Sequence, residues 1–154
     1  AMQAGLATAR WPGRLERLTL PDGSELLLDG AHNPAGAQAL ATALQELGER
    51  RVILLLGMME DKDLQGVLQP LLQRVQQVIT VSPAQERSLP ASELAARCRT
   101  AGTPATAADS VAAGLEAARA AAGPGDLIVA AGSLFLVGEL KALLAGVPCE
   151  AVRG

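Results

Sequence analysis

Aromatic side chains are almost absent from this sequence of 154 residues, and no excess of basic side chains accompanies their absence. Tyr does not occur, and Phe and Trp occur once each. Bases would therefore find almost no aromatic surface to stack on. The formal net charge of −3 also lacks the positive excess that tracking a phosphate backbone requires. We expect no nucleic-acid partner, and a core of aliphatic side chains and alanine.

Cysteine and histidine are scarce as well. Cys98 and Cys149 show no Cys-x-x-Cys spacing, and His32 is the only histidine, so neither a zinc site nor a disulfide framework is indicated. Cys98 falls on the apolar side of an expected helix, which is typical of a reduced core residue in a cytoplasmic protein. The apolar stretch 127–138 is much shorter than the roughly 20 residues of a membrane span, and no signal-peptide pattern opens the sequence. We therefore expect no membrane segment.

Several common site motifs are also missing. The sequence has no Gly-x-Gly-x-x-Gly after an expected strand and no Gly-x-x-x-x-Gly-Lys-Ser/Thr. It also has no Gly-x-Ser-x-Gly. The sequence therefore predicts neither a dinucleotide fingerprint, nor a phosphate-binding loop of its own, nor a hydrolase nucleophile.

The periodicity of the apolar residues predicts one α/β domain. Segments 14–20 and 25–29 flank a Pro-Asp-Gly-Ser turn and predict an antiparallel hairpin. Further strands are expected at residues 51–57, 77–82, 105–108 and 126–132, and a helix is expected after residue 29 and after each of these strands. Strands and helices that alternate along the chain with short connections predict a Rossmann-like fold, with a mostly parallel sheet and helices on both faces.

The same pattern predicts where the helices begin and which side chains they bury. Asn33 followed by Pro34 is what a helix N-cap and first helical position favour. Ser92 is expected to cap a later helix. Leucines at helical spacing, among them Leu47, Leu143 and Leu144, are expected on buried faces.

One edge of the predicted sheet should collect the polar residues that follow its strands. In an open α/β sheet, ligands bind outside the carboxyl ends of the strands. The polar residues and segments expected at this edge are Asp29, His32, 58–63, Ser82, Asp109 and Ser133.

Each candidate also has a purely structural explanation. Asp29 could hydrogen-bond its own turn, and His32 could be a satisfied loop histidine. Ser133 could cap the last helix, although Gly132-Ser133 also offers a hydroxyl and free N–H groups to a carboxylate. Lys62, between two acids that most simply cap a helix, is the cation there that could meet an anion. The residue type and position of Arg14 are ordinary for a solvated surface charge.

Four segments together resemble the C-terminal domain of folylpolyglutamate synthase/dihydrofolate synthase, in the Mur ligase superfamily. They are 11–16 (WPGRLE), 28–34 (LDGAHNP), 56–58 (LGM) with 61–63 (DKD), and 132–139 (GSLFLVGE). The most specific part is DGAHNP behind PGRLE. By this resemblance, residues 14–154 form a Mur ligase C-terminal-type domain, and residues 1–13 lead in from an N-terminal domain.

The resemblance implies an ATP-dependent ligase. In that family, ATP with Mg²⁺ phosphorylates a carboxylate of folate or dihydropteroate, and L-glutamate then displaces the phosphate. The implied partner is a P-loop ATPase domain of the same enzyme, which holds the metal. The present chain is expected to be inactive alone and cytoplasmic.

The resemblance also implies roles for individual residues. Arg14 and Asp29 correspond to ATP contacts, and His32 and Ser133 correspond to contacts with the incoming glutamate. Asn33 and Lys62 are further candidates, while no catalytic or metal-binding residue is expected in this domain. The alternative is a stand-alone binding or regulatory module of the same fold without catalysis.

Overall fold

A hairpin opens the part of the chain that the computed structural model describes, which is residues 15–145. Strands β2 (Glu16–Thr19) and β3 (Glu25–Leu28) pair antiparallel. In the turn, Leu20 N donates to Ser24 O at 2.8 Å, and Asp22 Oδ1 accepts from Ser24 N at 2.9 Å. The predicted hairpin is confirmed. Arg14, the expected first residue of its first strand, lies outside the described residues.

Helices and strands alternate after the hairpin, as the periodicity predicts. In chain order they are α1 (Pro34–Glu46), β4 (Val52–Leu56), α2 (Leu64–Leu72), β5 (Gln77–Thr80), α3 (Ala91–Thr100), β6 (Ala105–Ala107), α4 (Val111–Ala121), β7 (Leu127–Ala131) and α5 (Leu134–Ala145). The strands are one to three residues shorter than expected, and their order along the chain is the predicted one.

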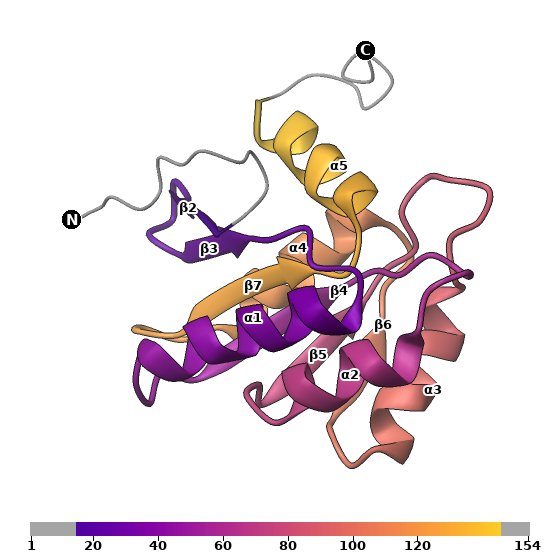
Figure 1. The fold of residues 1–154 in the computed structure, drawn as a ribbon. Coiled ribbons are helices and arrows are strands. Elements are labelled where there is room, and N and C mark those ends of the chain that lie inside the picture. The colour runs from indigo at the N-terminus through magenta and orange to yellow at the C-terminus, as the bar shows by residue number, and fades with distance from the viewer. Residues whose placement is uncertain (1–14, 146–154) are drawn as a thin grey trace.

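The six described strands form one sheet with the order β2-β3-β7-β4-β5-β6 (Figure 1). Every pair except β2 with β3 is parallel. Strands β4 and β7 lie side by side in the centre, and all their residues are buried. Strands buried on both faces need continuous apolar runs, and VILLL and LIVAA provide them.

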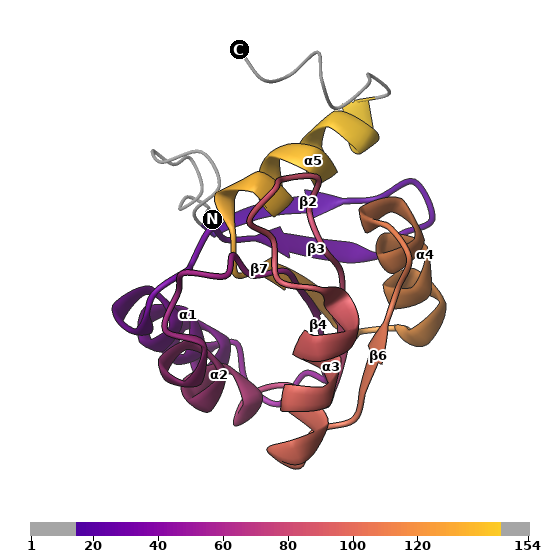
Figure 2. The ribbon, with the colours of Figure 1, turned by 90° about the vertical axis from the view of Figure 1, so that its right-hand side faces the viewer.

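Two helical layers cover the sheet, as Figures 1 and 2 show. One core packs α1, α2 and α3 against one face, where Leu54 and Val129 point. The other packs α4 and α5 against the opposite face, where Ile53 and Ile128 point. Adjacent residues serve opposite faces because side chains alternate along a strand. Both cores are aliphatic, and Phe135 is 49% exposed, so the predicted aliphatic core is confirmed for residues 15–145.

The prediction of Ser92 as an N-cap is wrong. Helix α3 begins at Ala91, with Pro90 at the N-cap position and no side chain capping it. Leu94 N donates to Pro90 O at 3.1 Å, which closes the first helical turn before Ser92 could act as a cap. The N-cap of α1 is Asn33, as predicted.

Three leucines that were expected to be buried are partly exposed. Leu47 follows the last turn of α1, where Gly48, with φ of +89°, turns the chain away, and 37% of Leu47 is exposed. Leu143 and Leu144 are 37% and 36% exposed, because the last turn of α5 rises away from the sheet (Figures 1 and 2). Cys98 is fully buried as predicted, and burial raises the pKa of its thiol to about 11. Within the described residues, no helix has the length and apolarity to cross a bilayer.

Asp22 makes the stability of the fold depend on pH in the acid range. Hydrogen bonds from the backbone and side chain of Ser24, and then the nearby Arg119, lower its pKa to about 2. Because the folded pKa lies below the ordinary 3.8, the carboxylate stabilises the fold above that pH, and its contribution is lost as the pH falls toward 2. We expect Asp22→Asn to lower the melting temperature near neutral pH, and the difference from the unaltered chain to vanish toward pH 2.

Thermal unfolding over this pH range measures the effect. Glu116→Gln is the matched control, because it removes the other acidic partner of Arg119 and leaves the turn intact. It should lower the melting temperature less, since an exposed ion pair contributes little. A difference for Asp22→Asn that stays constant down to the lowest pH would contradict the role assigned to this carboxylate.

Candidate functional site

Backbone hydrogen bonds join the loops that follow β3, β7 and β4. Asp29 N donates to Ala130 O at 3.0 Å, and Gly132 N donates to Ala31 O at 2.8 Å. On the other side of β7, Gly57 N donates to Ala131 O at 3.2 Å. The helices after β3 and β7 pack on opposite faces of the sheet. The two loops therefore diverge at a topological switch point, which is where α/β sheets bind ligands.

Gly132 makes this close approach possible. Its φ is +109°, which side chains other than glycine rarely adopt. A Cβ at this position would lie 2.1 Å from Gly57 O. Only glycine fits here, and it leads the chain directly into Ser133 and α5.

Asp29 is 3% exposed and lies just beyond β3. Its Oδ1 accepts a hydrogen bond from Ala31 N at 2.8 Å. The structural explanation, an acid bonded to its own turn, is therefore correct. The same contact fixes the carboxylate at the carboxyl edge of the sheet.

The His32 ring lies 2.9 Å, measured from Nδ1, from Gly30 O. A carbonyl oxygen only accepts, so Nδ1 carries a hydrogen and donates it. The ring is half-buried and held by its own loop, which leaves Nε2 as the nitrogen that can meet a ligand.

Asn33 and Pro34 build the start of α1. Asn33 Oδ1 accepts from Gly36 N at 2.8 Å, and Pro34 occupies the first helical turn. At the neighbouring helix, a Cβ on Gly66 would come within 2.6 Å of Pro34 Cγ. The N-terminal ends of α1 and α2 are thus in direct contact, so the loop carrying His32 and the loop carrying Lys62 run close together.

Ser133 is 2% exposed and caps α5. Its Oγ accepts from Phe135 N at 3.0 Å and from Leu136 N at 3.4 Å. These bonds use the oxygen lone pairs and leave the hydroxyl hydrogen to donate. No acceptor for that hydrogen is found among residues 15–145, so Ser133 can serve both as a cap and as a donor to a ligand.

Lys62 lies in the loop between β4 and α2 and is half-buried. Asp63, not Lys62, caps α2, through a hydrogen bond of 3.0 Å from Gly66 N to its Oδ1. Lys62 forms no ion pair with any described residue. Its ammonium group therefore has no internal acidic partner in the part of the chain between residues 15 and 145.

Residues 13–134 match the family model described as Mur ligase, glutamate ligase domain. The chain belongs to this family. It is 36% identical over 144 residues to the "Probable bifunctional folylpolyglutamate synthase/dihydropteroate synthase" of Haloferax volcanii. That match covers 92% of this chain and 17% of the Haloferax volcanii protein.

Solved structures of folylpolyglutamate synthase/dihydrofolate synthase are similar to this chain in fold. The structure named "E.coli FolC in complex with DHPP and ADP" superposes on 92% of this Mur ligase domain with a TM-score of 0.81 and 29% identity. A folylpolyglutamate synthase/dihydrofolate synthase structure with Mn, AMPPNP and L-glutamate bound has a TM-score of 0.79 and 28% identity over 90% of this chain. The present chain spans 33% and 32% of those two chains. The predicted fold and family are confirmed.

Among residues 15–145 of the Mur ligase domain, no group of three or more His, Cys, Asp and Glu side chains is placed to hold a metal ion.

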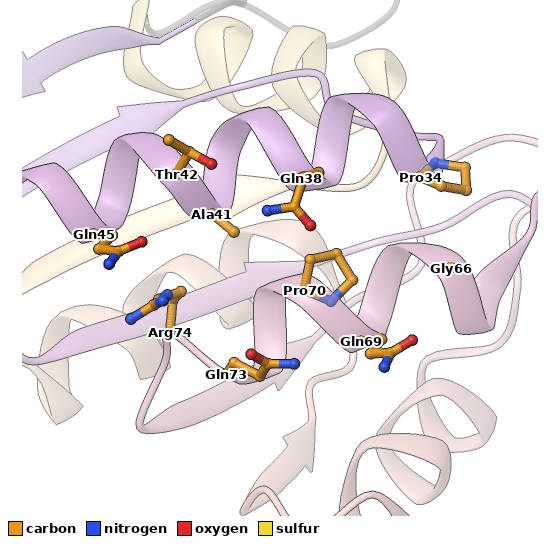
Figure 3. A pocket seen from close by; sticks show the side chains of 10 residues that line it. All are labelled: Pro34, Gln38, Ala41, Thr42, Gln45, Gly66, Gln69, Pro70, Gln73 and Arg74. Atoms are coloured by element: carbon orange, nitrogen blue, oxygen red, sulfur yellow. The ribbon is translucent and has the colours of Figure 1, made fainter.

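A groove of about 400 Å³ lies between α1 and α2 (Figure 3). Its lining is largely polar and includes Gln38, Gln45, Gln69 and Arg74. Pro34 and Gly66 line one end of it, but none of the described candidate site residues Asp29, His32, Asn33, Lys62 and Ser133 does. The candidate site is therefore the strand edge rather than this groove.

Some residues fall outside the site or outside the described chain. Ser82 and Asp109 are exposed at the predicted edge, and Ser110, not Asp109, caps α4. Arg14, Cys149 and the lead-in at residues 1–13 lie outside the described residues. Sequence reasoning missed the β5–α3 loop (residues 81–90), which packs beside the Lys62 loop, because that segment has no apolar periodicity.

Replacement of Gly132 tests the close approach of the loops. Gly132→Ala should lower the free energy of unfolding by at least about 2 kcal/mol, since it adds a strained backbone and a clash with Gly57 O. The matched control is Gly138→Ala in α5, where a Cβ would meet nothing within 4 Å. Alanine there should raise the stability by about 0.5–1 kcal/mol. Urea unfolding measures the free energy of unfolding of both variants. Equal changes in the two would contradict this role of Gly132.

The cap of α1 has a similar test. Asn33→Ala should cost about 1 kcal/mol of stability, because Gly36 N loses its acceptor. Asn33→Asp keeps that acceptor and should remain near the stability of the unaltered chain. Urea midpoints give the comparison. Equal losses in the two variants would show that Asn33 acts through something other than capping.

Proposed function

We propose that this chain is the glutamate- and nucleotide-contacting C-terminal domain of an ATP-dependent ligase that adds L-glutamate to folate or dihydropteroate. The observation that supports this proposal is the hydrogen bond from Gly132 N to Ala31 O, which holds the Asp29–His32 loop beside Ser133 at the switch point. The similar structures with ADP or with L-glutamate bound point to the same ligands.

The nucleotide role is assigned to Asp29 and Arg14. A buried, oriented carboxylate suits the hydroxyl groups of a ribose, because it accepts hydrogen bonds from both. Arg14 suits a phosphate, since a guanidinium group can donate two parallel hydrogen bonds to it. Its assignment rests on the resemblance alone, because it lies outside the described residues.

The incoming glutamate is assigned to groups from three loops. The Ser133 hydroxyl can donate to one carboxylate, and the Lys62 ammonium can pair with a carboxylate as a point charge. His32 Nδ1 donates to Gly30 O, so Nε2 of the same neutral ring can accept a hydrogen bond from the glutamate amine. Asn33, which is committed to its cap, is assigned no ligand contact. This division holds the two carboxylates of glutamate and orients its amine for the reaction.

The chemistry explains why such a site needs a second domain. ATP transfers its terminal phosphoryl group to a substrate carboxylate and gives an acyl phosphate. The glutamate amine attacks that carbonyl carbon, the C–N bond forms, the bond to phosphate oxygen breaks, and the amine loses a proton. Water would hydrolyse the acyl phosphate, so the cleft has to exclude it. We assign one side of that cleft to this domain and the phosphate-binding side, with Mg²⁺, to a P-loop ATPase domain.

The experiment that tests this function compares the intact protein with the isolated chain. An immunoblot of lysate from the source organism establishes the native size. Release of phosphate that requires both ATP and L-glutamate, with folate or dihydropteroate present, is expected from the intact protein and not from the 154-residue chain. Ligand binding without turnover by the intact protein would instead indicate a non-catalytic module. Turnover by the isolated chain would contradict the need for a partner domain.

His32→Ala tests the glutamate assignment in the intact enzyme. The loss of one hydrogen bond to a charged substrate should raise the KM for glutamate about tenfold, or lower kcat, and leave the KM for ATP nearly unchanged. Gln45→Ala, at the far end of α1, is the control and should alter neither constant. An unchanged dependence on glutamate would remove His32 from the site.

A further inference from the structure

We propose that Glu139 is a positioning residue, which fixes Lys62 relative to Ser133 by holding the β5–α3 loop against α5. This inference rests on the proposed glutamate site and adds to it a residue that touches no substrate. It follows from a continuous series of contacts that joins two parts of the site through a third loop.

The first contact lies on α5, the helix that Ser133 caps. Glu139 is half-buried in its second turn, and its Oε1 accepts a hydrogen bond of 2.9 Å from Ala84 N. Figure 2 shows the β5–α3 loop passing beside the first turns of α5. The two groups are 55 positions apart in the chain, so this bond ties together segments that have no local connection.

The β5–α3 loop is in turn paired with the loop that carries Lys62. Glu60 N donates to Arg87 O at 2.7 Å, and Leu89 N donates to Met58 O at 2.8 Å. Met59 and Ser88 form an antiparallel bridge between these two bonds. Residues 58–60 therefore have a short ladder of their own, which ends two residues before Lys62.

Hydrogen bonds within the β5–α3 loop connect its two ends. Ser88 Oγ donates to Pro83 O at 2.7 Å, and Gln85 N donates to the same oxygen at 2.7 Å. These bonds connect the Ala84 end, which Glu139 holds, to the Ser88 end, which pairs with Met59. We expect a segment closed in this way to shift as a unit rather than residue by residue.

These contacts determine where the ammonium group of Lys62 can lie. The Lys62 side chain is long, so the place of its ammonium group depends on the backbone that carries it. That backbone is held on one side by β4 and on the other by the β5–α3 loop. Glu139 adds the link to the helix of Ser133, and thereby sets the separation of two groups assigned to one glutamate.

Two substitutions distinguish the effect of the hydrogen-bond acceptor of Glu139 from the effect of its negative charge. Glu139→Ala removes the acceptor, whereas Glu139→Gln keeps a carbonyl oxygen that can accept from Ala84 N. In the intact enzyme, Glu139→Ala should raise the KM for glutamate about fivefold and leave the KM for ATP unchanged. Glu139→Gln should stay within about twofold of the unaltered enzyme. Equal impairment by both variants, or a lower melting temperature with no change in the KM for glutamate, would overturn the proposal.

A double-mutant cycle tests whether Glu139 acts through Lys62. In a Lys62→Ala background, Glu139→Ala should add little further increase in the KM for glutamate. Increases that multiply independently would refute this route of action.

Hydrogen exchange on the full 154-residue chain tests the link without any ligation assay. Glu139→Ala should speed exchange at Ala84, Glu60 and Leu89, and Glu139→Gln should not. Faster exchange confined to Ala84 would show that the loops do not move together and would overturn the proposal. If the unaltered intact protein did not ligate glutamate, the proposed function would fail, and the exchange data would still decide the coupling.

Discussion

The close packing of three strand ends is the constraint on which the candidate site depends. Gly132 brings the end of β7 against Gly57 O on one side, and donates a hydrogen bond to Ala31 O on the other. Asp29, His32 and Ser133 follow these backbone contacts in the loops. Their positions are therefore set by main-chain geometry that tolerates little change, and a preorganised site of this kind loses little entropy when a ligand binds.

Several residues of the candidate site combine a structural role with the binding role that we propose for them. The oxygen lone pairs of Ser133 cap α5, while its hydrogen remains for a ligand. Nδ1 of His32 holds the ring to Gly30 O, and Nε2 is the nitrogen that we assign to the ligand. The sequence analysis gives each of these residues a structural and a functional interpretation as alternatives. The two are compatible, because each side chain has more than one hydrogen-bonding position. Asn33 is the exception, since it is assigned only to its cap.

Local patterns were enough to predict most of the fold. The continuous apolar run of β4 predicts a central strand, and Asn33-Pro34 predicts the start of α1 because capping depends on adjacent residues. The failures have equally local causes: Pro90 closes the first turn of α3 before Ser92, and α5 continues beyond the sheet that would have buried Leu144. The contact between Glu139 and Ala84 could not be predicted, because no periodicity links residues 55 positions apart.

The order of the strands makes the proposed site depend on the pairing of a single strand, β7. Strand β7 is the last of the described strands in sequence, yet it lies between β3 and β4. Strand β3 and strand β4 pair with β7 and not with each other, so β7 is the connection between the β2–β3 hairpin and the β4-β5-β6 part of the sheet. The same strand leads into Gly132 and Ser133, beside Ala31 and Gly57. A change that weakens the pairing of β7 would therefore expose two strand edges and disperse the proposed site at once.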